Sequence, residues 1–148
     1  MDDTQLLLEL NKIMTLEHGH LGMYRDFDRH QDQDMRRTFR RFAEVEEEHI
    51  QKIKNVILNM GGKVSLLAEG GDILGKLFGI TINLGSDHDL IKTFSFIEKK
   101  SHEGYQKFVT KLEQDQEKRS QLIAEIASSN MLEAWLMHLW LEDKMKKI

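Results

Sequence analysis

The chain has 148 residues, of which 31% are charged and 40% hydrophobic, and its formal net charge is −4. This length and composition predict one globular domain spanning residues 1–148, neither disordered nor membrane-spanning. Cysteine is absent, which excludes disulfides, thiolate zinc sites, iron–sulfur clusters and cysteine nucleophiles, so any metal must be bound by oxygen or imidazole nitrogen. The interspersed charges give no reason to expect nucleic acid as a partner, and without an apolar run of bilayer-crossing length a membrane partner is not expected either. The first residues resemble no targeting signal, and we expect a cytoplasmic location.

Proline is also absent and long stretches lack glycine, which favours long, uninterrupted helices. Apolar residues recur at helical spacing from about residue 4 to 28 and predict the first helix. The polar residues 29 to 34 predict a turn in which an aspartate caps the next helix. That second helix is expected from about residue 35 to 60, and it ends at Gly61-Gly62.

Residues 63 to 86 are rich in both glycine and large apolar side chains. They predict a long crossover that packs over the core, with an exposed surface for a membrane or a partner as the alternative. The third helix is expected to open at Ser86-Asp87, whose side chains can cap it. After a break at residues 115 to 118, a fourth helix runs from about Ser120 to the end. The expected fold is all-α, an up-down-down-up four-helix bundle with a long crossover between its second and third helices.

Glu46 and His49 lie three residues apart on the second expected helix and therefore share one face. The other residues of that face are apolar: Phe39, Phe42, Ile50, Ile53, Val56 and Ile57. Burying an ionised group without a partner is costly, so this pair needs a partner, and a metal ion is the most economical candidate. The alternative is that both residues belong to a solvated acidic run, as Glu44, Glu47 and Glu48 do.

One helical hairpin occurs twice in the sequence, at an offset of 81 residues. The offset pairs four residues of the first helix with similar residues of the third: Leu16 with Ile97, Glu17 with Glu98, Tyr24 with Tyr105, and Phe27 with Phe108. The chemistry of the second helix does not repeat in the fourth. At the same offset Glu46 falls on Ala127. His49 falls on Asn130, so the second hairpin lacks a Glu-x-x-His motif.

A single glutamate on one helix, Glu-x-x-His on the next, and a second such set after a crossover resembles the ferritin-like di-iron carboxylate superfamily, of the rubrerythrin and bacterioferritin type. The resemblance implies iron bound by four residues, Glu17, Glu46, His49 and Glu98. Ala127 cannot ligate a metal, and the neutral amide of Asn130 is a poor iron ligand compared with imidazole. We therefore expect a partial site, single or asymmetric, that holds one or two iron ions, with other divalent metals as alternatives.

Other residues near this pattern have weaker claims. His20 follows Glu17 by three residues and His102 follows Glu98 by four, so either could supply an imidazole, although each is also typical of a partly exposed helical histidine. Glu17 and Glu98 themselves have an alternative reading, as inward carboxylates satisfied by hydrogen bonds. Tyr24 and Tyr105 are interpreted as core tyrosines that bond to buried carboxylates, outside the metal's own ligand set. We expect the remaining histidines on the surface: His18, His30, His88 and His138.

Three functions from different classes follow. The first is a rubrerythrin-like metalloprotein that, if redox-active, acts on peroxide, oxygen or iron with electrons from an external donor. The second is a degenerate, non-catalytic relative that acts as a binding or scaffold module. The third is a hydroxylase-like protein that presents its crossover to a membrane or a quinone. A homodimer is expected on superfamily grounds alone.

Overall fold

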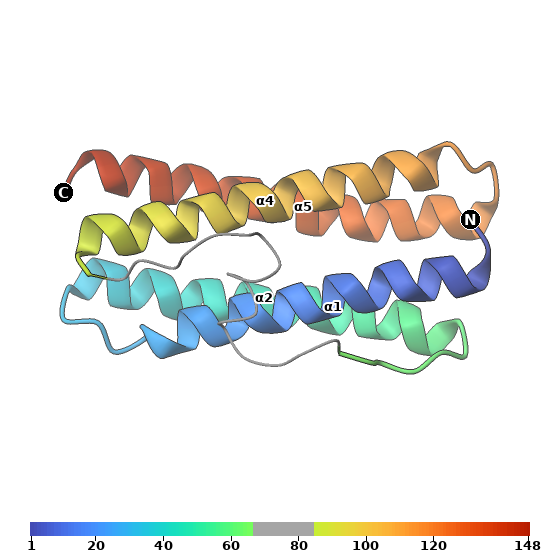
Figure 1. Cartoon of the computed structure of the whole chain (residues 1–148), viewed down its shortest axis with the longest axis horizontal. Coiled ribbons are helices and arrows are strands. Elements are labelled where there is room, and N and C mark those ends of the chain that lie inside the picture. Colours follow the sequence, from blue (N-terminus) through green and yellow to red (C-terminus); the bar gives the residue numbers. More distant parts are fainter. Residues whose placement is uncertain (67–84) are drawn as a thin grey trace. The chain divides into compact units, whose positions relative to one another are not determined.

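The computed structural model describes residues 1–66 and 85–148 (Figure 1). Within these ranges all regular structure is α-helical, in four helices: α1 (Asp3–Asp26), α2 (Gln33–Asn59), α4 (Asp87–Glu113) and α5 (Lys118–Lys146). The chain divides into two compact units, one on each side of residues 67–84. Each unit is a helical hairpin, with α1 packed on α2 in the first and α4 packed on α5 in the second.

The first unit is an antiparallel pair whose helix ends follow from local chemistry (Figure 1). The Asp32 carboxylate accepts a hydrogen bond from the Met35 amide at 2.9 Å, which caps the start of α2. At the other end Gly61 has a φ of 75°, a left-handed conformation that glycine adopts without steric cost. The Gly62 amide donates to the Ile57 carbonyl at 3.0 Å, so α2 ends in a Schellman motif.

Large apolar side chains fill the interface of this first hairpin. Those buried on the two helices are Leu6, Leu10, Met14, Leu21 and Tyr24 on α1, and Met35, Phe39, Phe42, Ile53 and Ile57 on α2. Tyr24 packs against the rings of Phe39 and Phe42, with centroid distances of 5.9 and 5.3 Å. Outside the core, Arg25 of α1 pairs with Glu47 of α2. The hairpin therefore has a continuous apolar interior that sets which faces of α1 and α2 meet.

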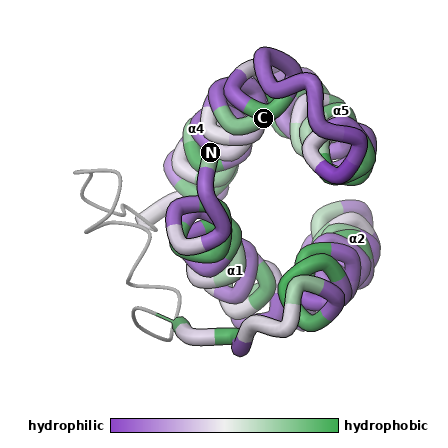
Figure 2. Tube along the Cα trace, turned by 90° about the vertical axis from the view of Figure 1, so that its right-hand side faces the viewer, coloured by the Kyte–Doolittle hydropathy of each residue, from purple (hydrophilic) through white to green (hydrophobic). Residues whose placement is uncertain are grey.

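The second unit is built in the same way. Ser86 caps α4 by accepting a hydrogen bond from the Asp89 amide at 3.1 Å, as the sequence predicts. The turn before α5 is held by Asp115, whose carboxylate accepts bonds from the Glu117 amide and the Ser120 hydroxyl. Each of the four helices carries both hydrophobic and hydrophilic residues (Figure 2). The buried hydrophobic residues of α4 and α5 include Leu90, Ile91, Phe94, Ile97, Ile123, Ala134 and Leu141.

The all-α prediction and the four helices are confirmed for the described residues. The helix bounds differ from expectation by small amounts: α2 begins at Gln33 rather than about residue 35, because Asp32 is the residue that caps it. The predicted crossover, residues 63 to 86, lies mostly outside the described residues, and the up-down-down-up order stays a prediction. Of the helices in the described ranges, none combines the length and the apolar character that crossing a bilayer requires.

Candidate metal centre

Glu17, Glu46 and His49 meet inside the first hairpin. Glu17 comes from α1 and the other two from α2, and each side chain is 1% exposed. Nδ1 of His49 lies 2.8 Å from Oε2 of Glu17 and 3.4 Å from Oε2 of Glu46. One ligand atom from each residue lies within 4.8 Å of the other two, close enough for all three to bind one ion. Three of the four predicted ligands therefore lie together in one buried cluster that could hold a metal ion, and their role as ligands stays a prediction.

His20 joins the same cluster. Its Nδ1 lies 3.3 Å from Oε1 of Glu17 and 3.6 Å from Oε1 of Glu46, and its side chain is completely buried. The sequence favoured a partly exposed histidine at this position, and that interpretation was wrong. The sequence does contain a pattern that indicates burial of His20, because Glu17 and His20 have the same three-residue spacing as Glu46 and His49.

The charges of Glu17 and His49 stabilise each other. Burial by itself raises the pKa of Glu17, but the neighbouring His49 and His20 imidazoles outweigh it and hold that pKa well below its ordinary value. Burial by itself lowers the pKa of His49, but the charge of Glu17, the hydrogen bond to it and the nearby Glu46 carboxylate raise this pKa to about 11. Without a metal, His49 is protonated at neutral pH and donates a hydrogen bond to the Glu17 carboxylate.

The carboxylate of Glu46 has fewer hydrogen bonds than that of Glu17. Both of its carboxylate oxygens are buried, and neither accepts a hydrogen bond from the residues that the structure describes. The imidazole nitrogens of His20 and His49 lie 3.6 and 3.4 Å from these oxygens. A buried polar atom in this state carries a desolvation cost that a hydrogen bond or a metal ion would remove.

Glu98, the fourth predicted ligand, lies on α4 in the second unit, where it is completely buried. Its part in metal binding stays a prediction. Within that unit the Asn130 amide nitrogen donates a hydrogen bond to the Tyr105 hydroxyl at 3.1 Å, and both side chains are buried. Asn130 is therefore a hydrogen-bond donor to a core tyrosine, and Ala127 beside it on α5 offers no ligand atom.

Two histidines of the second unit lie within hydrogen-bond distance of backbone carbonyl oxygens. Nδ1 of His102 lies 3.2 Å from the Met131 carbonyl oxygen, and Nδ1 of His138 lies 2.9 Å from the Ser95 carbonyl oxygen. Both rings pack against Trp135, with centroid distances of 4.9 and 5.0 Å. The expectation that His138 is a surface residue was wrong, because α4 supplies its hydrogen-bond partner and it is 8% exposed.

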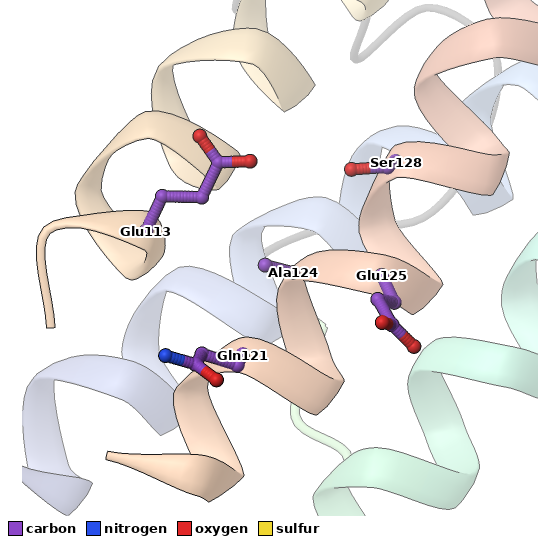
Figure 3. Close-up of a pocket in the computed structure, with 5 residues that line it drawn as sticks. All are labelled: Glu113, Gln121, Ala124, Glu125 and Ser128. Atoms are coloured by element: carbon purple, nitrogen blue, oxygen red, sulfur yellow. The ribbon is translucent and has the colours of Figure 1, made fainter. Parts of the chain in front are cut away.

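A shallow hollow of about 420 Å³ lies between the end of α4 and the first half of α5. Its lining residues are Glu113 on α4 and Gln121, Ala124, Glu125 and Ser128 on α5 (Figure 3). Both carboxylates are exposed and solvated, and the lining contains no histidine. The hollow therefore lacks the donor set that distinguishes the cluster in the first hairpin.

Comparison with known proteins identifies no relative: no protein-family model, curated protein or solved structure matches this chain.

Proposed function

We propose that this protein binds a transition-metal ion at Glu17, Glu46 and His49, as a partial relative of the ferritin-like di-iron carboxylate proteins. The observation that carries the proposal is the Glu46 carboxylate, which is buried and accepts no hydrogen bond from the described part of the chain. The two imidazoles of the same cluster lie 3.4 and 3.6 Å from its oxygens. A divalent ion would satisfy its charge and that of Glu17 together.

The donor set selects the class of metal. Carboxylate oxygen together with imidazole nitrogen suits iron, manganese, cobalt and zinc, whereas calcium and magnesium prefer oxygen alone. Iron is the ion implied by the ferritin-like resemblance, and when bound it supplies a redox couple and open coordination positions. The substrate class is then peroxide, oxygen or iron itself.

The chain has no cysteine for an electron-transfer centre of its own, so a separate protein or small molecule supplies electrons. The superfamily analogy also favours a homodimer.

The residues of the second hairpin favour one complete metal site in the chain rather than two. At the offset of the repeat, Ala127 has no ligand atom and the Asn130 amide nitrogen is engaged by Tyr105. A pair of irons that share electrons would need ligands from both hairpins. We therefore propose a single-ion or asymmetric site with reduced or altered reactivity.

Metal content is the direct test. Full-length protein is loaded with Fe²⁺ without oxygen, desalted and subjected to elemental analysis, beside His49→Ala and the matched control His88→Ala, whose imidazole is exposed on α4. We expect about one ion per chain in wild type and control, and a large loss in His49→Ala. Equal metal content in all three proteins would contradict the proposal. Far-UV circular dichroism confirms that each variant is helical before the comparison is made.

A second candidate function is a non-catalytic binding or scaffold protein. The observation in its favour is the 2.8 Å hydrogen bond between His49 and Glu17, which satisfies these two groups without any metal. This candidate predicts a folded, metal-free protein whose melting temperature is unchanged by iron or by a chelator. The hydroxylase-like alternative depends on the crossover, which lies mostly outside the described residues.

A further inference from the structure

The first hairpin carries two Glu-x-x-His pairs that face each other. On each helix the glutamate and the histidine are three residues apart and so share a face. Helices α1 and α2 are antiparallel (Figure 1), so the order of the pairs is reversed across their interface. Glu17 therefore contacts His49, and His20 contacts Glu46. All four side chains are at most 1% exposed.

We propose that His20 is the fourth protein ligand of a single-ion site that lies wholly within α1 and α2. The inference rests on the proposed function and extends it, because it adds a ligand and makes the site independent of Glu98. The site is then formed by two carboxylates and two imidazoles from one hairpin.

The contacts form a closed ring. His20 Nδ1 lies 3.3 Å from Oε1 of Glu17 and 3.6 Å from Oε1 of Glu46. His49 Nδ1 lies 2.8 Å from Oε2 of Glu17 and 3.4 Å from Oε2 of Glu46. Each imidazole nitrogen thus stands between one oxygen of each carboxylate. These separations are close to the roughly 3.0 to 3.4 Å between neighbouring ligand atoms that are bound about 2.1 Å from one ion. Glu17, Glu46 and His49 already offer three ligand atoms within 4.8 Å of one another, and ligation of the same ion by His20 requires the two carboxylates to turn toward it.

The second hairpin offers an internal comparison. At the offset of 81 residues, the four positions correspond to Glu98, Ser101, Ala127 and Asn130. Three of the four ligand-type residues of the first hairpin are therefore replaced together, and Ser101 stands where His20 does. One hairpin has a complete donor set and the other has one carboxylate, which is the pattern expected if the first hairpin binds its ion alone.

The composition of the ring also defines the ion. Two carboxylates balance a divalent charge in this buried site, and two neutral imidazoles favour ions of borderline hardness such as Fe²⁺, Co²⁺ or Zn²⁺. Cobalt is the most useful probe of these three, because its visible absorption reports the ligands directly.

Cobalt titration of the metal-free, full-length protein tests the assignment, with absorption spectrum, stoichiometry and affinity as readouts. The variants are His20→Ala and the near-isosteric His20→Gln, with His49→Ala as the positive control for loss, Glu98→Gln, and the exposed His88→Ala as the matched control. We expect one cobalt per chain and an unchanged spectrum in wild type, Glu98→Gln and His88→Ala. Both His20 variants should bind cobalt at least about tenfold more weakly, with a shifted absorption band.

The other possible outcomes contradict different parts of the two proposals. Unchanged cobalt binding in helical His20→Ala or His20→Gln, with loss in His49→Ala, overturns this inference and leaves the proposed function standing. Loss of cobalt in Glu98→Gln overturns the independence from the second unit. Failure of the wild type to bind any ion overturns both proposals. Proton NMR of the cobalt-loaded wild type needs no variant: two exchangeable, contact-shifted imidazole N–H signals are expected in water, and a single one contradicts ligation by His20.

Discussion

His49 of α2 and Glu17 of α1 are joined by a 2.8 Å hydrogen bond between two side chains that are each 1% exposed. A proton on His49 holds this pair together when no metal is bound. The same nitrogen, Nδ1, is the atom that faces both carboxylates of the cluster. Proton and metal therefore compete for one position.

The metal-free protein should depend on pH through this pair. The pKa of His49 is raised from 6.5 to about 11, so its contribution to stability is complete below pH 6.5 and is lost as the pH rises towards 11. The pKa of Glu17 is lowered from 4.5, so its contribution is complete above pH 4.5 and is lost as the pH falls below that value. We expect the free energy of unfolding of wild type, relative to His49→Gln, to be greatest between pH 4.5 and 6.5. Urea denaturation across pH checks this, and a difference that grows from pH 7 to pH 10 would contradict it.

Metal binding should stabilise the protein selectively. At a free concentration about 100 times the dissociation constant, Fe²⁺, Co²⁺ or Zn²⁺ adds about 2.7 kcal/mol, which for a chain of this size raises the melting temperature by about 5 to 10 °C. Calcium and magnesium should have no such effect, because half of the donor set is imidazole nitrogen. Differential scanning calorimetry with each ion, followed by addition of a chelator, measures this. An equal shift with calcium would point to a surface carboxylate site.

The two glutamates should respond oppositely to apolar substitution in the metal-free protein. Glu46→Leu removes a buried carboxylate that accepts no hydrogen bond from the described residues, and should raise the free energy of unfolding by about 1 to 3 kcal/mol. Glu17→Leu leaves the His49 imidazolium buried without its hydrogen-bonded partner, and should lower it by about 3 to 5 kcal/mol. Both variants should lose metal. Chemical denaturation of the two variants and of wild type measures these changes. A loss of stability in Glu46→Leu as large as that in Glu17→Leu would contradict the predicted difference between the two glutamates.

The repeat predicts that the second hairpin can be given a site of its own. Ser101→His, Ala127→Glu and Asn130→His together restore two facing Glu-x-x-His pairs with Glu98, and should raise the metal content from one towards two ions per chain. The double variant without Ser101→His should bind the added ion about tenfold more weakly. Elemental analysis and cobalt absorption measure both. A helical triple variant with no gain in metal would show that α4 and α5 do not present these positions as α1 and α2 do.

The helices themselves could be predicted from the sequence, because helical periodicity, caps and glycine stops act within a few residues of one another. Asp32, Ser86 and the Gly61-Gly62 pair bound the helices where local chemistry places them. That Glu46 and His49 share a buried face followed in the same way, because a three-residue spacing on an apolar face is a local property.

Which side chains contact Glu46 and His49 is determined by the tertiary structure. His20 has the same spacing from Glu17 as His49 has from Glu46, yet its place in the cluster depends on the rotation and register of α1 against α2, which no local pattern specifies. His138 is buried for a similar reason, since a carbonyl 43 residues away on α4 accepts its hydrogen bond. Spacing along one helix determines which side chains share a face, and packing between helices determines what that face meets.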